Sequence, residues 1–113
     1  MAYNLKLAER VRKKLKEMPG ISVEEKKMFG GLAFLVNGKM CINIGDEQLM
    51  CRFDPSLQQD ILQRKGVKPT VMKGREYTGY CYVDLDVIEK DKDLMYWIRL
   101  CLDYNEEARS SRK

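Results

Sequence analysis

The sequence predicts an α+β fold, with a mainly antiparallel meander sheet and helices in two layers. Three observations lead to this class. Apolar residues recur at helical spacing near both ends of the chain. Short apolar runs separated by turn residues occupy the middle, and 113 residues are enough for one hydrophobic core. We expect a single domain over residues 1–113, with a frayed tail at about 109–113.

The first expected element is an amphipathic helix over about Ala2–Met18, ended by Pro19-Gly20. It carries six basic and two acidic side chains, a local excess equal to the net charge of +4 on the whole chain. Such a patch can meet phosphates, and Arg10, Lys13 and Lys14 are its candidates for nucleic-acid contact. The alternative is an ordinary solvated helix face.

Four strands joined by short turns should follow this helix. Their expected ranges are Lys26–Phe29, Gly31–Val36, Lys39–Ile44 and Gln48–Phe53. Asn37-Gly38 favours a two-residue type I′ turn that pairs Val36 with Lys39. Continuing this register pairs Ala33 with Ile42 and predicts a core face and an outer face.

The predicted core face contains Ala33, Leu35, Met40, Ile42, Ile44, Leu49, Cys51 and Phe53. The outer face contains Leu32, Phe34, Cys41, Asn43, Met50 and Arg52. This outer face is more apolar than a solvated sheet surface should be. We therefore expect it to be covered by the chain's own helix or tail, or by a partner.

The second half should contain a helix, two strands and a last helix. Asp54-Pro55 is a typical helix start, and Gly66 ends that helix. The strands are expected at Pro69–Met72 and Tyr80–Val83. The last helix should begin at Asp91 or Asp93 and run to about Ala108, with Trp97 in its buried stripe. The predicted order is therefore helix, three or four strands, helix, two strands, helix.

The four cysteines show no CxxC or other close pairing. They are Cys41, Cys51, Cys81 and Cys101. This spacing disfavours a disulfide framework and a structural zinc site, and it favours free buried thiols. No apolar run approaches the roughly 18 residues needed to cross a bilayer, and the N-terminus lacks a signal-peptide core. We expect a cytoplasmic protein that has no membrane association and no cofactor.

Four segments follow one another in a characteristic order: MFGGLAFLVNGKM, LMCRFDP, GREYTGYCYVD and DLMYWIRLCLDY. From about Met28 to about Asn105 they resemble the TfoX/Sxy N-terminal domain family. The resemblance implies a compact two-layer domain of the secretion-chaperone-like kind, with no established enzymatic activity. Full-length bacterial members look like two-domain regulators of natural competence that assist transcription driven by the cyclic AMP receptor protein. Because this chain ends soon after the first domain, we carry over the fold and a regulatory or partner-binding role, but not the pathway.

Reactive chemistry is missing from the sequence. The chain has no histidine, which removes Cys-His and Ser-His pairs and His-based metal sites. Gly30-Gly31 lacks the context of a phosphate loop, so we interpret it as a bend or bulge. We therefore expect a protein that is not an enzyme.

Arginine and tyrosine near the predicted hairpins are better functional candidates, because Arg suits contacts with carboxylate or phosphate and Tyr can stack or hydrogen-bond. The candidate partner-binding residues are Phe34, Lys39, Met50, Arg52, Arg75, Tyr77 and Tyr80. The alternative is that these residues are ordinary exposed side chains at the edges of strands, with no functional role. The leading hypothesis is a non-enzymatic regulatory domain that binds another protein or a second copy of itself. The alternative is a nucleic-acid-binding accessory protein that uses the first helix.

Overall fold

The computed structural model describes residues 3–28 and 30–105. These residues form an α+β fold in the predicted order. The elements are α1 (Leu5–Lys16), β1 (Val23–Met28), β2 (Gly31–Val36), β3 (Lys39–Ile44), β4 (Gln48–Arg52), the 3₁₀ turn η1 (Pro55–Leu57), α2 (Gln58–Leu62), β5 (Val67–Met72), β6 (Arg75–Asp84), the 3₁₀ turn η2 (Leu85–Val87) and α3 (Asp91–Asn105).

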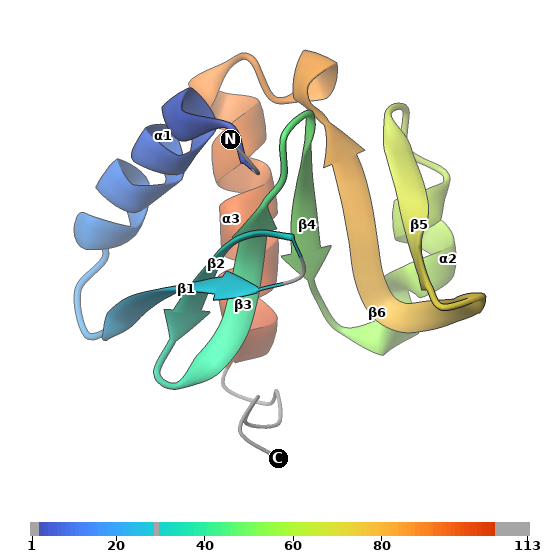
Figure 1. The fold of residues 1–113 in the computed structure, drawn as a ribbon, viewed down its shortest axis with the longest axis horizontal. Helices are drawn as coiled ribbons and strands as arrows, with labels where there is room; N and C mark the ends of the chain where they lie inside the picture. Colours follow the sequence, from blue (N-terminus) through green and yellow to red (C-terminus); the bar gives the residue numbers. More distant parts are fainter. Residues whose placement is uncertain (1–2, 29, 106–113) are drawn as a thin grey trace.

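The strands form one antiparallel sheet in the order β1-β2-β3-β4-β6-β5. The sheet curls so that β1 lies in front of β3 (Figure 1). The helices α1 and α3 lie against the face of the sheet that points away from β1, and α2 lies beside β5. We call the side that packs on α1 and α3 the helix face, and the other side the concave face.

The predicted helices differ from the observed ones mainly at their ends. The side-chain oxygen of Asn4 accepts a hydrogen bond from the Leu7 amide at 2.9 Å, so α1 begins at Leu5. The helix expected after Asp54-Pro55 begins with a 3₁₀ turn, capped by the Asp54 carboxylate on the Ser56 amide. The predicted positions at Ala2, Phe29 and Ala108, and the tail at 109–113, lie outside the described residues.

The strand β6 is much longer than the predicted Tyr80–Val83. Lys73 and Gly74 adopt positive φ values of 54° and 77°, which form a tight turn between β5 and β6. This turn lets Arg75 pair with Met72, so the pairing begins five residues before Tyr80. The predicted strands left 73–76 unassigned, because its four polar or glycine residues do not alternate with apolar ones.

The largest correction concerns the two faces of the sheet. The Asn37-Gly38 turn forms as predicted, with φ values of 53° and 82°, and Val36 pairs with Lys39. A register shift then falls between Phe34 and Leu35, so Phe34 faces Ile42. Because side chains alternate along a strand, a shift of one residue changes which of them share a face. The prediction that Ala33 faces Ile42 is wrong, since Ala33 pairs with Asn43.

Burial agrees with this corrected pairing. Leu32, Phe34 and Cys41 were predicted on the outer face but belong to the main core on the helix face. Ala33, Leu35 and Met40 were predicted in that core but belong to a smaller cluster with Met50. Met28, Tyr80 and Tyr82 pack against this smaller cluster, which lies on the concave face. The four apolar residues of the smaller cluster are therefore buried, and they offer no exposed apolar sheet surface.

The double glycine has a steric explanation. A Cβ atom added to Gly31 would collide with the carbonyl oxygen of Ile44 and the side-chain oxygen of Asn43. Strand β2 therefore approaches β3 too closely at this point for any side chain. This supports the interpretation of Gly30-Gly31 as a structural bend.

Candidate partner-binding site

The C-terminal end of α3 is joined to the β2–β3 hairpin by two hydrogen bonds. The side-chain amide of Asn105 donates to the Val36 carbonyl at 3.2 Å, and the Lys39 ammonium donates to the Asn105 carbonyl at 3.0 Å. Asn105 is only 4% exposed. The positive charge of Lys39 also complements the negative end of the helix dipole. These contacts fix the end of α3 relative to the sheet.

Beside this junction, an arginine lies close to two tyrosine rings. The Arg52 guanidinium is 5.6 Å from the ring centroid of Tyr80 and 6.0 Å from that of Tyr104. Arg52 also donates to the Met40 carbonyl at 3.4 Å. The Tyr77 ring meets Tyr80 edge to face, with centroids 6.2 Å apart. We call Arg52, Tyr77, Tyr80 and Tyr104 the arginine–tyrosine cluster.

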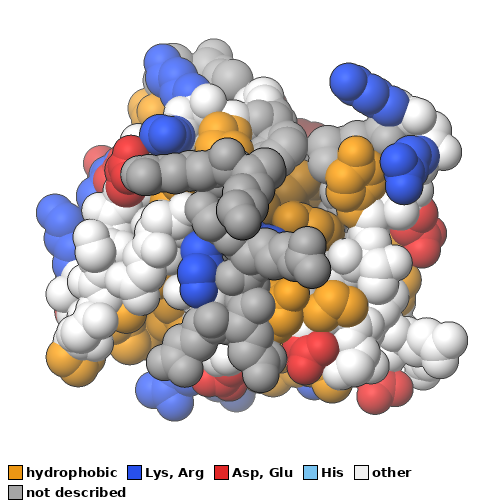
Figure 2. Space-filling model, turned by 90° about the horizontal axis from the view of Figure 1, so that it is seen from below, with side chains coloured by type: hydrophobic (Ala, Val, Ile, Leu, Met, Phe, Trp, Pro, Cys, Tyr) orange, Lys and Arg blue, Asp and Glu red, His pale blue; other side chains and the backbone are white. Residues whose placement is uncertain are grey.

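Local pairing explains how the arginine–tyrosine cluster forms. Arg52 is the last residue of β4 and pairs directly with Tyr80 of β6, so their side chains share one face. Tyr104 comes from the last turn of α3. Tyr77 is 37% exposed, and the other three members are half-buried. Figure 2 shows the molecule from below. On this side, hydrophobic side chains gather in the right half of the view, between basic and acidic side chains.

The structure brings together several of the predicted partner-binding residues. Arg52, Tyr77 and Tyr80 form the cluster, and Arg75 is an exposed residue of the same strand as Tyr77. Lys39 lies on the adjacent hairpin, where it bonds to Asn105.

Two other predicted residues do not reach the surface. Phe34 is fully buried, and Met50 is 3% exposed. The prediction that Phe34 points outward is wrong because of the register shift beside it.

Tyr104 was missed by sequence reasoning. It stands seven residues after Trp97, a spacing that keeps two residues on one side of a helix. This signal places Tyr104 near the buried stripe of α3. The spacing does not show that the end of α3 lies beside the end of β4.

Three of the six basic residues of α1, Arg10, Arg12 and Lys14, form ion pairs with carboxylates. Arg10 and Lys14 approach the Asp91 carboxylate at 3.2 Å and 3.6 Å. The hydrogen bond from Arg10, followed by the charge of Lys14, lowers the pKa of Asp91. Lys13 is exposed and lines a shallow hollow on α1 with Arg12 and three other residues of that helix and its end.

A second ion pair ties α1 to the edge strand. Arg12 donates two hydrogen bonds to Glu25 of β1, at 2.6 Å and 2.7 Å. This paired contact lowers the pKa of Glu25 and raises that of Arg12. Glu25 therefore lies on the helix face of β1, opposite Phe34.

The four cysteines, which are far apart in sequence, meet in the main core. They are Cys41 of β3, Cys51 of β4, Cys81 of β6 and Cys101 of α3. Cys51 and Cys81 are direct cross-strand partners, and the Cys101 thiol lies within hydrogen-bonding reach of Cys41 and Cys51. All four are free and buried, as predicted. Their convergence was not predicted, because it depends on the strand order and on the packing of α3.

The environment of these thiols opposes reactivity. Burial is the main cause that raises the pKa of Cys51 and Cys101. The neighbouring Cys101 thiol is the main cause for Cys41, where burial adds to the effect. A raised pKa keeps a thiol protonated and therefore a poor nucleophile. Across residues 3–28 and 30–105, no group of three or more potential ligand side chains is arranged to hold a metal ion.

The fold defines a small α+β domain in which arginine and tyrosine side chains gather at one end of the sheet. A model of the TfoX N-terminal domain family matches residues 15–104. The chain therefore belongs to the TfoX N-terminal domain family, which confirms the resemblance seen in its motifs. The family is of the regulatory type and is not known as enzymatic. No curated protein and no solved structure matches the chain.

The match to the family includes the whole sheet, α2 and nearly all of α3. It begins within α1, at Leu15. The arginine–tyrosine cluster thus lies inside the matched region. No helix of the described part of the chain has the length and apolar character required to span a membrane.

Proposed function

We propose that this domain is a non-enzymatic regulatory module of the bacterial cytoplasm that binds a protein partner through the arginine–tyrosine cluster. The observation that carries the proposal is the contact of Arg52 with the rings of Tyr80 and Tyr104. Arg and Tyr are the residue types most enriched in the energetic centres of protein interfaces. Here they are fixed by the surrounding fold.

The support for this site is its preorganisation. Arg52 and Tyr80 are held by strand pairing, and the junction at Asn105 holds the helix end that carries Tyr104. A surface whose side chains already occupy defined positions loses less conformational entropy when a partner binds. The partly exposed Tyr77 adds a ring with few rotatable bonds at the open side of the cluster.

The chemistry of the chain supports a role without catalysis. The sequence has no histidine, and all four thiols of the main core are buried. The pKa values of Cys41, Cys51 and Cys101 are raised. The missing histidine removes His-based acid–base catalysis, and the raised pKa values oppose thiolate catalysis at Cys41, Cys51 and Cys101.

The proposal can be tested with a photo-crosslinking amino acid placed at Tyr77. The matched control position is Lys90, which is exposed and lies next to the opposite end of α3. We expect a discrete crosslinked product, with a partner protein or with a second copy of the chain, from position 77 only. The change Arg52→Ala should reduce the yield of this product by about tenfold, the effect of losing an interface hot spot of roughly 1.4 kcal/mol.

Two results would contradict the proposal. One is the same crosslinking pattern from positions 77 and 90. The other is a product from position 77 whose yield does not change with Arg52→Ala in a chain that has kept its circular dichroism spectrum.

The alternative function, nucleic-acid binding through α1, has weaker support. Arg10 and Lys14 share the Asp91 carboxylate, which reduces the positive charge that they present to a phosphate. Binding to duplex DNA that falls steeply with salt and is weakened by replacing Arg10, Lys13 and Lys14 with Ala would favour this alternative. An absence of affinity at low salt would remove it.

A further inference from the structure

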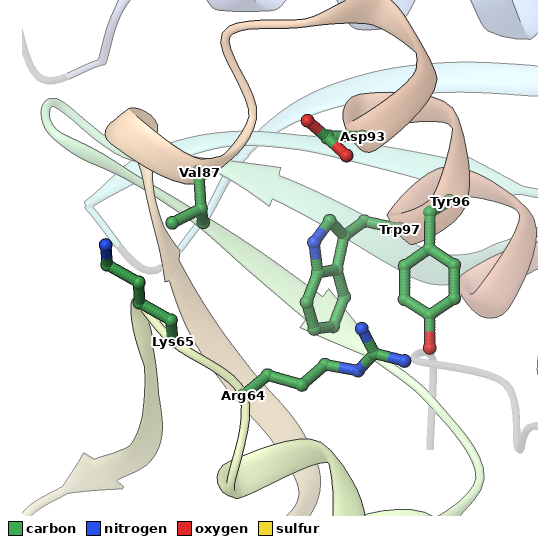
Figure 3. Close-up of a pocket in the computed structure, with 6 residues that line it drawn as sticks. All are labelled: Arg64, Lys65, Val87, Asp93, Tyr96 and Trp97. Atoms are coloured by element: carbon green, nitrogen blue, oxygen red, sulfur yellow. The ribbon is translucent and has the colours of Figure 1, made fainter.

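A cavity of about 380 Å³ lies between the segment that follows α2 and the first turns of α3. Figure 3 shows Arg64 running beneath Trp97 toward Tyr96, with Asp93 above and with Val87 and Lys65 on the opposite side. These six residues line the cavity. Its volume is in the range of sites for small molecules. None of its residues belongs to the arginine–tyrosine cluster.

The segment that presents the two basic residues is held by backbone hydrogen bonds. The Arg64 amide donates to the Ile61 carbonyl at 3.1 Å, and the Arg64 carbonyl accepts from Val67 at 3.3 Å. Two residues after Arg64, the Gly66 carbonyl accepts a hydrogen bond from the Asp84 amide at 2.8 Å. The basic side chains therefore extend from a fixed backbone at the mouth of the cavity.

Two aromatic rings form the opposite wall. The Tyr96 and Trp97 rings meet edge to face, with centroids 5.3 Å apart and an interplanar angle of 86°. The Arg64 guanidinium lies 4.4 Å from the Tyr96 centroid, a cation–π contact that holds it beside the cavity. Only 4% of Trp97 is exposed, and this residue lines the cavity. The indole thus offers a fixed apolar surface rather than a mobile one.

The charges at the cavity favour an anion. Arg64 and Lys65 stand against a single carboxylate, that of Asp93. Within residues 3–28 and 30–105, neither basic side chain forms an ion pair with an acidic one. The two positive charges are therefore available to a ligand. An apolar wall with a basic side chain on each side of the cavity is complementary to an aromatic ring that carries a carboxylate.

We propose that this cavity binds a small aromatic carboxylate. Its ring would lie against Trp97 and Val87, and its carboxylate would accept hydrogen bonds from Arg64. Lys65 would add a second positive charge from the opposite side of the cavity. The site adds a small-molecule ligand to the domain. It does not depend on the arginine–tyrosine cluster, so either proposal can fail without the other.

Trp97 gives the test a direct readout, because it is the one tryptophan of the chain. The probe is phenylacetate, titrated while the indole N–H resonance of Trp97 is followed by ¹H–¹⁵N NMR. We expect a saturable shift at millimolar concentration, the affinity usual for a ligand of this size. The neutral analogue 2-phenylethanol and the ringless anion acetate should each bind at least about tenfold more weakly, since each lacks one of the two interactions.

Charge variants sharpen the test. Arg64→Gln should weaken phenylacetate binding about tenfold, because it removes a charge-assisted hydrogen bond. The matched control Arg99→Gln makes the same change at an exposed position of α3 outside the cavity, and it should leave the affinity unchanged. Asp93→Asn should strengthen binding about twofold to threefold, since it removes the repelling carboxylate.

Three results would overturn the proposal. The first is no shift of the Trp97 resonance with phenylacetate. The second is equal binding of 2-phenylethanol, which would indicate an apolar surface without anion recognition. The third is Arg64→Gln with unchanged affinity, given that Arg64 is exposed and its replacement leaves the core intact.

Discussion

The two faces of the sheet are both buried in the middle but differ in what surrounds them. On the helix face, α1 and α3 close over a large core that includes Phe34, Ile42 and all four cysteines. On the concave face, only Ala33, Leu35, Met40 and Met50 form the buried cluster, and tyrosines pack around it. The comparison indicates that the helix face supplies most of the stability. At its end, the concave face continues into the half-buried Arg52 and Tyr80 and the exposed Tyr77, through which we propose that the domain binds a partner.

The largest effect expected from this comparison concerns thiol reactivity. Because all four cysteines lie in the core of the helix face, their reaction with Ellman's reagent requires the fold to open. We expect native thiols to react at least about a thousandfold more slowly than thiols of the unfolded chain, which corresponds to an opening free energy of about 4 kcal/mol. One thiol that reacts in native buffer as fast as in denaturant would show that the core is open there.

Truncation of one large side chain on each face compares the two cores directly. Phe34→Ala should lower the free energy of unfolding by about 3–5 kcal/mol, because the cavity forms between the sheet and two helices. Met50→Ala should cost about 2 kcal/mol, since the smaller cluster has more freedom to collapse. Urea unfolding followed by Trp97 fluorescence measures both values. A larger loss of unfolding free energy for Met50→Ala than for Phe34→Ala would mean that the concave face contributes more to stability than the helix face.

The junction between α3 and the β2–β3 hairpin can be broken at one side chain. Asn105→Ala removes the side-chain hydrogen bond to the buried Val36 carbonyl and should cost about 1–2 kcal/mol. It should also shift the NMR signals of Tyr104, which precedes Asn105 on the same helix. The control Asp103→Ala lies in the same turn but is exposed, and it should change stability by less than about 0.5 kcal/mol. Equal losses for the two variants would mean that the junction does not hold the helix end.

The smallest expected effect is that of the ion pair between α1 and β1. The folded-state pKa of Glu25 is lowered, so the pair stabilises the fold above the ordinary carboxyl pKa and loses this effect as the pH falls through the lowered value. Both side chains are about one-third exposed, so Glu25→Gln should cost only about 0.5 kcal/mol at pH 7. Thermal unfolding at several pH values should show this difference shrink in acid. If the loss of stability in Glu25→Gln persists at low pH, packing rather than charge is its cause. The same change at the neighbouring residue, Glu24→Gln, provides the control.

The fold was largely predictable because its signals are local. Helical periodicity identified α1 and α3, and the Asn37-Gly38 pair identified the central hairpin together with its first pairing. The facing of the strands was not predictable, because one register shift between Phe34 and Leu35 reverses the pattern that a regular ladder would give. No residue type near Phe34 and Leu35 indicates that the strand register shifts there. Phe34 was therefore chosen as an interface residue although it is fully buried.

The candidate site was predicted in part. Arg52, Tyr77 and Tyr80 were selected from residue type and from closeness to the hairpins, and the structure brings them together. Tyr104 and the cavity beside Trp97 were missed, because each combines residues from elements far apart along the chain. Trp97 was correctly expected to be buried, but its position in the stripe of α3 does not show that a cavity opens beside it.

The sequence alone determined the class of fold, the order of the elements and the family, because periodicity, turn residues and motif order are properties of neighbouring residues. The tertiary structure decided which face of each strand meets the helices, where the end of α3 rests and how four separated cysteines share one core. These features depend on a register shift and on packing between distant elements. They are stabilised by contacts that form only when the complete sheet packs against the helices.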